Sequence, residues 1–358
     1  MKILHLIDIP WWSGLASYAL DCMSAQAEMG HKVFLLCEKK SLSSRRAALI
    51  GFPFSTIGGR YFWRAPGNFI RIGLRLILKR PQVIVAHTGS THWIAVFWGR
   101  LLGIPVVRTR AISRRIKSGV IGRLVYRNTS CVVAASERLK EECIGHLPIK
   151  WNGKIRVLLP PVENPRLETP GPFKAQVPQN YRIGVLARLD PKKGHFKILE
   201  SFRKLQSKEP ECELHIAGAE ENLPWNELVR QAAEFGLKNV WYHGFLEHEK
   251  IWDFMKACRV GLIASLESEE VSRALLEWMS AGRPVVASKV GCIPEILKDG
   301  VGGFLYSPGD AEAMAEKAGL LLKDFPLAQK MGQYNLEFAA KYFTKAQFKS
   351  LWREILYA

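Results

Sequence analysis

No apolar run in the sequence approaches the ~20 residues that a membrane-spanning helix requires. Closely spaced cysteines are also lacking, because the seven cysteines are scattered along 358 residues and no two form a C-x-x-C pair. An odd, scattered set of this kind argues against a disulfide framework and against a zinc site. We therefore expect a protein of the reducing cytoplasm that does not span the membrane.

Acidic residues are absent from 98 consecutive positions, 39–136, which carry 18 lysines and arginines. Residues 1–170 hold 26 basic and 9 acidic residues, whereas the remaining residues hold 25 basic and 24 acidic ones. The first half therefore carries +17 of the net charge of +18. Such a field attracts polyanions, whether phospholipid headgroups, nucleic acid or phosphorylated substrates.

Apolar, β-branched segments alternate with amphipathic segments along the chain, and this alternation predicts βα units that build parallel sheets. The alternation stops at 160–179, where six prolines fall, and then restarts. Together with the length, this break predicts two α/β domains. The predicted strands of the first half are 2–7, 32–37, 83–87, 106–109 and 131–134. Those of the second half are 182–187, 213–217, 240–243, 260–264 and 284–288.

These patterns predict an α/β domain over 1–165, a linker over 166–180 and a second α/β domain over 181–340. The remaining residues, 341–358, contain an amphipathic pattern that predicts a C-terminal helix. The side on which this helix docks stays open, and a return to the first domain is one option.

Two basic residues follow the first predicted strand of the second domain. Arg188 comes directly after the strand, and Lys193 lies five residues further on, just before a predicted helix. Ligands of open parallel sheets bind at the carboxyl ends of the strands. Two cations beside a helix N-terminus would neutralise a diphosphate and stabilise it as a leaving group. The alternative is an exposed basic turn without a ligand.

An acidic segment follows the fourth predicted strand of the second domain. A helix is expected there, with Ser272 as N-cap and Gly282 as its end. Glu277 would lie inside this helix among apolar neighbours, where ribose hydroxyls could meet its carboxylate. Glu269, one turn before the helix, would reach the hydroxyls of the same ligand. Alternatively, Glu269 only favours the helix N-terminus and Glu277 lies on a solvated edge.

The order of these residues resembles a known family. The pattern Arg188-x4-Lys193 precedes Glu269-x7-Glu277, and the segments AGRPVVAS (281–288) and GCIPEI (291–296) follow. This series resembles the C-terminal half of family 4 of the retaining glycosyltransferases with the GT-B fold. The resemblance implies two Rossmann-like domains that face each other across a cleft.

The resemblance implies that the second domain binds a nucleotide-sugar donor. Arg188 and Lys193 would contact its diphosphate, Glu277 its ribose and Glu269 the transferred sugar. No cofactor and no metal are expected, and the sequence contains no D-x-D triplet of the kind that metal-dependent transferases of the other common fold need.

One departure from the family lies beside this donor site. Where the family often has Glu-Gly-Phe-Gly, this chain has Glu269-Glu270-Val271-Ser272. We still expect Val271 and Ser272 at the donor. The Ser-Arg-Ala-Leu-Leu-Glu segment that continues from Ser272 to Glu277 is similar to that of family members.

The first half resembles the family more weakly. Gly14 matches a glycine-rich loop that approaches the donor phosphate in the family, although the usual Gly-Gly is here Ser13-Gly14. An ordinary strand-to-helix turn is the alternative. His87 stands at the end of a predicted strand, where relatives place a histidine near donor or acceptor, and a buried, hydrogen-bonded histidine is the alternative. Arg110 stands in the predicted acceptor region, with Ala111 where relatives often have histidine.

Residues 66–80 predict a basic amphipathic helix with Trp63 just before it. Its apolar residues would face the core or a bilayer, and its cations would favour an anionic membrane surface. The alternative is a packing helix with a solvated face. The apolar set is Phe69, Ile70, Leu74 and Ile77, and the basic set is Arg71, Arg75 and Lys79.

Taken together, these features predict a retaining glycosyltransferase that is peripheral on the inner face of the cytoplasmic membrane. Its partners would be a nucleotide sugar, a lipid-linked or lipopolysaccharide-like glycan acceptor and the anionic membrane, which the first domain would face. A sugar-nucleotide epimerase of similar build is one alternative. Another is a non-catalytic basic protein that binds nucleic acid, although no recognisable nucleic-acid module is present.

Overall fold

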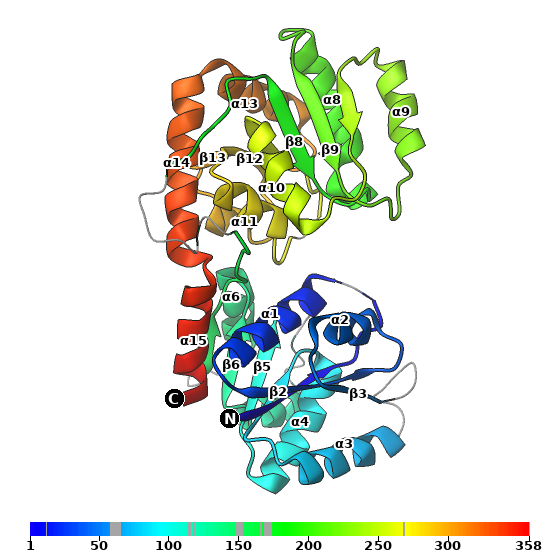
Figure 1. The fold of residues 1–358 in the computed structure, drawn as a ribbon, viewed down its shortest axis with the longest axis vertical. Helices are drawn as coiled ribbons and strands as arrows, with labels where there is room; N and C mark the ends of the chain where they lie inside the picture. The colour runs from blue at the N-terminus through cyan, green and yellow to red at the C-terminus, as the bar shows by residue number, and fades with distance from the viewer. Residues whose placement is uncertain are drawn as a thin grey trace. The chain divides into compact units, whose positions relative to one another are not determined.

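The computed structural model describes residues 1–11, 13–57, 66–113, 116, 119–147, 153–164, 167, 174–267 and 269–357. The chain divides into two compact units (Figure 1). The first unit comprises Met1–Pro161 and Lys345–Ala358, and the second comprises Val162–Thr344. The predicted linker, 166–180, lies partly outside the described residues.

The first unit is built on a parallel sheet with the strand order β3-β2-β1-β4-β5-β6-β7. All the strands predicted for this half are present, which confirms this part of the predicted fold. Two short strands at the sheet edges, β3 and β7, were not predicted. The strands are β1 (Lys2–Ile7), β2 (Lys32–Glu38), β3 (Phe54–Ile57), β4 (Val83–Ala86), β5 (Val106–Arg110), β6 (Cys131–Ala134) and β7 (Ile155–Val157).

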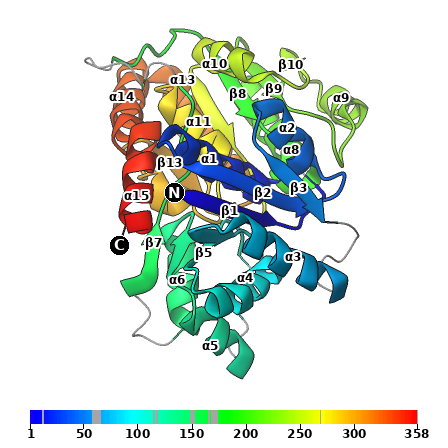
Figure 2. The ribbon, with the colours of Figure 1, turned by 60° about the horizontal axis from the view of Figure 1, so that its bottom comes forward.

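The helices of this unit cover both faces of the sheet. Successive strands run from β1 to β3 in one direction and from β4 to β7 in the other, so right-handed crossovers place α1 and α2 opposite α3, α4 and α5. Figure 2 shows this separation. The helices are α1 (Gly14–Glu28), α2 (Leu42–Ile50), α3 (Pro66–Lys79), α4 (Gly89–Leu102), α5 (Val120–Arg127), α6 (Glu137–His146) and α15 (Lys345–Tyr357).

The C-terminal helix α15 packs on α1 of the first unit. Phe348 meets Tyr18 edge to face, with 6.1 Å between the ring centroids, and Trp352 is fully buried. At the surface, Nζ of Lys349 donates to Oε2 of Glu28 at 3.0 Å. The aromatic contacts therefore anchor the end of the chain on the first unit.

The second unit has a parallel sheet with the strand order β10-β9-β8-β11-β12-β13. Its predicted strands are present as well, and β13 was not predicted. The strands are β8 (Arg182–Leu186), β9 (Glu213–Ala217), β10 (Val240–Tyr242), β11 (Val260–Ile263), β12 (Val285–Ser288) and β13 (Gly303–Tyr306). The helices are η2 (Pro191–Lys193), α8 (His195–Gln206), α9 (Trp225–Glu234), α10 (His248–Ala257), α11 (Arg273–Ser280), α12 (Ile293–Ile296), α13 (Ala311–Lys323) and α14 (Phe325–Tyr342).

The position of α11 on this sheet is set by a close approach. The ring of Trp278, on α11, is fully buried against the two central strands. A Cβ atom added at Gly184 of β8 or at Gly261 of β11 would lie 2.5 Å from this ring. Only glycine at these two positions allows α11 to lie so close to the sheet, and α11 carries Glu277.

A chain of hydrogen bonds between buried side chains crosses the core of the first unit. Nε2 of His5 donates to Oε1 of Gln26 at 2.8 Å, so Nδ1 of His5 accepts from Nε2 of His87 at 2.9 Å. Nδ1 of His87 in turn accepts from the Thr109 hydroxyl at 2.7 Å. Burial lowers the pKa of His5 to about 4, although the hydrogen bond to Gln26 opposes this shift. Burial also lowers the pKa of His87.

We expect the free energy of unfolding to fall as the pH is lowered from 6.5 towards 4. In this window the folded state keeps His5 neutral while the unfolded chain takes up a proton, so acid favours unfolding. The pKa difference of His5 corresponds to about 3 kcal/mol. Urea unfolding followed by tryptophan fluorescence across this pH range measures the slope. His5→Gln should make the slope shallower and His146→Gln, on an exposed helix end, should not. An unchanged slope in His5→Gln would contradict the prediction.

Candidate active site

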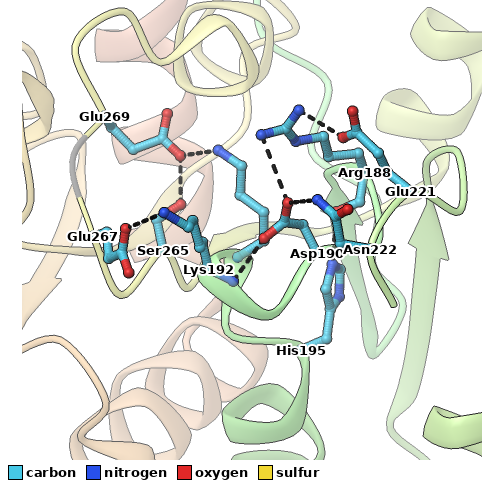
Figure 3. A network of polar contacts seen from close by, with 10 residues as sticks. Arg188, Asp190, Lys192, His195, Glu221, Asn222, Ser265, Glu267 and Glu269 are labelled. Carbon is cyan, nitrogen blue, oxygen red and sulfur yellow. Dashed lines mark hydrogen bonds and ion pairs between the residues drawn. The ribbon is translucent and has the colours of Figure 1, made fainter. Parts of the chain in front are cut away.

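Charged side chains from three loops meet at the carboxyl edge of the second sheet. The loops follow β8, β9 and β11, and β8 lies between β9 and β11. The direction in which successive strands are added reverses between β8 and β11, and ligands of open α/β sheets bind at such a point. Figure 3 shows the network of polar contacts that these loops form.

Arg188 stands two residues after the end of β8, with its side chain half exposed. One guanidinium nitrogen, Nη1, lies 2.6 Å from Oε2 of Glu221, in the loop after β9. The other, Nη2, lies 3.7 Å from Oδ2 of Asp190. The sequence placed a cation here, and the structure shows that two carboxylates surround it.

Asp190 holds this part of the loop in place. Its side chain caps the short helix η2 by accepting from the Lys192 backbone N–H at 2.9 Å, and it also accepts from the Asn222 amide at 2.8 Å. Burial alone would raise the pKa of Asp190, but these two hydrogen bonds and Arg188 lower it. His195, which is buried, fixes the backbone of Arg188 by donating from Nε2 to its carbonyl at 3.0 Å.

Sequence reasoning missed these supporting residues. Asp190 lies between Arg188 and Lys193, which were identified from the sequence, and an Asp-Pro turn before a helix is a signal for a capping carboxylate. For Asn222 and Glu221 the local sequence offers no comparable signal, since they come from the next βα loop.

Lys193 and Glu269 form an ion pair across two loops. Nζ of Lys193 donates to Oε1 of Glu269, and the Ser265 hydroxyl donates to the same oxygen. The Glu269 residue is 8% exposed and the Lys193 side chain 25%. The structure therefore brings together a cation and a carboxylate that the sequence assigned to one ligand.

The backbone of Glu269 is held by the loop after β12. The Cys292 N–H donates to the Glu269 carbonyl at 2.7 Å. Gly291, with a φ of +56°, lies so close that an added Cβ would be 2.0 Å from the same carbonyl oxygen. The GCIPEI segment (291–296) thus holds the backbone of Glu269 in place through Gly291 and Cys292.

The helix that carries Glu277 is α11, which begins at Arg273. Ser272 occupies the N-cap position, as the sequence predicted, and is buried, but its side chain makes no capping hydrogen bond. Its φ of −83° and ψ of 84° depart from the extended conformation of most caps. Val271, just before it, is half-buried. Glu277 is also half-buried, with the buried Trp278 next to it.

The candidate residues of the first unit are placed as follows. Gly14 is the first residue of α1; it is exposed, and an added Cβ would meet nothing within 4 Å. His87 is fully buried and both of its ring nitrogens are hydrogen bonded, which agrees with the alternative of a buried, hydrogen-bonded histidine. Arg110 is also buried, and its Nη2 lies 3.0 Å from Oε1 of Glu142 on α6. The side chains of His87 and Arg110 therefore make these polar contacts within the first unit.

The arrangement suits an anionic ligand with hydroxyl groups. Arg188 and Lys193 offer donors to phosphate oxygens, and Glu269 offers an acceptor to hydroxyls. Among the described residues, no group of three or more His, Cys, Asp or Glu side chains is arranged to hold a metal ion.

Comparison with protein families divides the chain in two. Residues 12–164 match the family described as Glycosyltransferase Family 4, and residues 172–338 match Glycosyl transferases group 1. A curated relative, the GDP-mannose-dependent alpha-(1-6)-phosphatidylinositol monomannoside mannosyltransferase of Mycolicibacterium smegmatis, is 26% identical over 90% of this chain and 82% of its own. The sulfoquinovosyl transferase of Arabidopsis thaliana is 31% identical over an aligned region that covers 42% of this chain and 29% of that relative.

Solved structures share the fold. Anabaena HepE, solved in complex with UDP, superposes with a TM-score of 0.83 over 100% of both chains at 19% sequence identity. At this level of identity the likeness concerns the fold, which is the two-domain GT-B arrangement of parallel sheets.

Replacing Gly291 should destabilise the loop that carries Glu269. In Gly291→Ala, the left-handed backbone costs about 1–2 kcal/mol, and relief of the clash with the Glu269 carbonyl adds about 1–3 kcal/mol. Gly300→Ala is the matched control, because Gly300 has a φ of +73° and open space around it. Thermal unfolding should show the larger loss for Gly291→Ala, and equal losses would argue against the tight support of Glu269.

Proposed function

Because this chain is a glycosyltransferase of the GT-B fold, matching family 4 in its N-terminal half and group 1 in its C-terminal half, we propose that it is a retaining enzyme that acts at the inner face of the cytoplasmic membrane. Its donor is a nucleotide sugar bound by the second unit. Its acceptor is a lipid-linked glycan or a lipopolysaccharide-like polysaccharide.

One observation carries the donor half of this proposal. Arg188, Lys193 and Glu269 come from loops that meet at the carboxyl edge of the second sheet. In the proposal, the two cations bind the donor diphosphate and Glu269 binds the hydroxyls of the transferred sugar. Glu277 and the backbone of Val271 and Ser272 contribute further donor contacts.

The proposed reaction follows from these charges. The bond between the anomeric carbon and the diphosphate oxygen breaks, and a bond from an acceptor hydroxyl oxygen forms on the same face of the sugar. The hydroxyl proton leaves with the nucleoside diphosphate. Arg188 and Lys193 stabilise the negative charge that develops on the diphosphate as the bond breaks.

The acceptor half of the proposal rests on a surface of the first unit. Exposed apolar side chains gather on α3, α4 and α5, which lie on one face of the sheet (Figure 2). No acidic residue occurs between 39 and 136, the stretch that contains all three helices. We call this surface the α3–α5 face; its exposed apolar residues are Ile70, Leu74, Ile77, Leu78, Trp93, Phe97, Leu101, Val120, Ile121 and Leu124.

Three stripes at four-residue spacing run along α3. The inner stripe (Asn68, Ile72, Leu76) is buried, the outer stripe (Ile70, Leu74, Leu78) is exposed, and the basic stripe (Arg71, Arg75, Lys79) is exposed as well. Of the apolar residues that were expected to face the core or a bilayer, Phe69 is half-buried. The other three, Ile70, Leu74 and Ile77, are exposed. Trp63, expected beside this helix, lies outside the described residues.

Aromatic contacts lock α3 against α4. The ring of Phe69 lies 5.6 Å from that of Trp93 and 4.9 Å from that of Phe97, measured between centroids. Nε1 of Trp98 donates to the Phe69 carbonyl at 3.1 Å. The two helices thus present their outer side chains as one rigid surface.

An anionic lipid surface fits this face. Apolar side chains would enter the headgroup region, while the neighbouring cations would meet lipid phosphates, each contributing about 1 kcal/mol. The mycobacterial relative is named for a phosphatidylinositol monomannoside, a lipid glycan, which supports an acceptor of this class. Within the described part of the chain, no helix is long and apolar enough to cross a bilayer.

A panel of UDP-, GDP-, ADP- and CMP-sugars should stabilise the wild type through one nucleotide class only. At a hundred times Kd, binding adds about 2.7 kcal/mol to the unfolding free energy, and thermal unfolding measures the shift. The double variant Arg188→Ala, Lys193→Ala should show no shift, because the diphosphate loses both cations. The control Lys192→Ala removes an exposed cation paired with Glu267 and should behave as wild type. Equal stabilisation of wild type and the double variant would remove the proposed donor site.

Vesicles of phosphatidylcholine with phosphatidylglycerol should sediment the protein, and vesicles of phosphatidylcholine alone should do so less. The triple variant Ile70→Ser, Leu74→Ser, Leu78→Ser should bind at least tenfold more weakly, since each aliphatic side chain contributes about 1 kcal/mol on immersion. Leu320→Ser, an exposed leucine of the second unit, is the control. Tighter binding to single- or double-stranded DNA than to the anionic vesicles would contradict a membrane role.

A further inference from the structure

The proposed donor site contains a carboxylate of the protein itself beside Arg188. Oε2 of Glu221 lies 2.6 Å from Nη1 of Arg188, and both side chains are about half exposed, at 47% and 48%. A guanidinium binds carboxylate and phosphate with the same donor geometry. Glu221 therefore occupies the groups that the proposed function assigns to the donor diphosphate.

The backbone that carries Glu221 is fixed next to Arg188. The N–H groups of Glu221, Asn222 and Leu223 converge on the carbonyl of Leu189, each at 3.2 Å. The Asn222 amide also donates to Asp190, at 2.8 Å. Because the loop after β9 is tied to the loop after β8 in this way, the Glu221 carboxylate stays within reach of Arg188 whenever its side chain turns towards it.

The two carboxylates around Arg188 differ in how easily they can leave it. Asp190 is buried and held by Lys192 N–H and the Asn222 amide, and it lies at the longer distance of 3.7 Å. The Glu221 side chain is half exposed, so it can return to water at little cost. Asp190 is therefore a permanent part of the loop, and Glu221 is a displaceable one.

We propose that Glu221 is a positioning residue that holds Arg188 before the donor binds and is displaced by the diphosphate of the incoming donor. This inference rests on the proposed donor site and goes beyond it, because it assigns a competing role to a residue outside the family pattern. Glu221 lowers the apparent affinity for donor and product, since each must replace an existing ion pair. When the nucleoside diphosphate leaves, Glu221 pairs with Arg188 again and so favours release.

The test compares Glu221→Gln with a matched charge removal. Glu267→Gln takes one negative charge from the same sheet edge, but Glu267 pairs with Lys192, at 2.7 Å, and is 60% exposed. Calorimetry with UDP, GDP or ADP, whichever stabilises the wild type, gives the Kd of each variant. Glu221→Gln should bind about two- to fivefold more tightly, the value of one exposed ion pair. Glu267→Gln should match wild type. Thermal unfolding of the ligand-free variants confirms that each is folded.

A double-mutant cycle separates this inference from the proposed function. In the Arg188→Ala background, Glu221→Gln should no longer tighten binding, because the guanidinium for which it competes is gone. Three results overturn the role of Glu221: no gain in Glu221→Gln, an equal gain in Glu267→Gln, or a gain that persists without Arg188. A different result, unchanged affinity in Arg188→Ala alone, would instead overturn the donor site itself.

Discussion

The parallel pairing of β8 with β11 is the constraint on which the candidate active site depends. Because the carboxyl ends of parallel strands lie at one edge of the sheet, the loops that follow β8 and β11 emerge side by side. Lys193 belongs to the first loop and Glu269 to the second, so residues 76 positions apart form an ion pair. The same pairing sets Gly184 opposite Gly261 and leaves room for Trp278, which places α11 on the sheet.

The two units treat their charges differently. At the edge of the second sheet, Arg188 and Lys193 each meet a carboxylate of the protein, which avoids the cost of partly buried, unpaired charge. An anionic ligand must therefore exchange one set of ion pairs for another, and its affinity reflects the difference between them. In the first unit, Arg110 inside the fold is paired with Glu142 of α6, beyond the stretch without acids. The cations of α3 are exposed and face no carboxylate within 39–136. Arg75 donates to the Ser55 hydroxyl at 3.0 Å, and Lys79 lies over the Phe34 ring.

Most strands of both parallel sheets could be predicted because a continuous apolar, β-branched run is a local signal. Such a run stands out against its amphipathic neighbours whatever it later packs against, even at four residues, as in β4 (VIVA). In β3 (FSTI), β7 (IRV) and β13 (GFLY), polar residues or glycine interrupt the run and weaken the pattern. The amphipathic character of α3 could also be predicted from the sequence. Which of its apolar stripes would be buried against the core could not. Ile72 and Leu76 face the core, and the equally apolar Leu74 and Leu78 do not, because the neighbouring α4 and sheet decide which stripe is covered.

The sequence by itself determined the types and order of the charged groups at the strand ends, since Arg188, Lys193 and Glu269 follow strands at characteristic spacings. Tertiary structure alone decided which charges meet. Glu221 reaches Arg188 only because β9 lies beside β8, and both ring nitrogens of His87 are hydrogen bonded inside the core because β1 and β5, which carry His5 and Thr109, flank β4 in the sheet. Spacing along a chain specifies chemistry near each strand end. The pairing of strands distant in sequence specifies neighbours, and hydrogen bonds and ion pairs act only between neighbours.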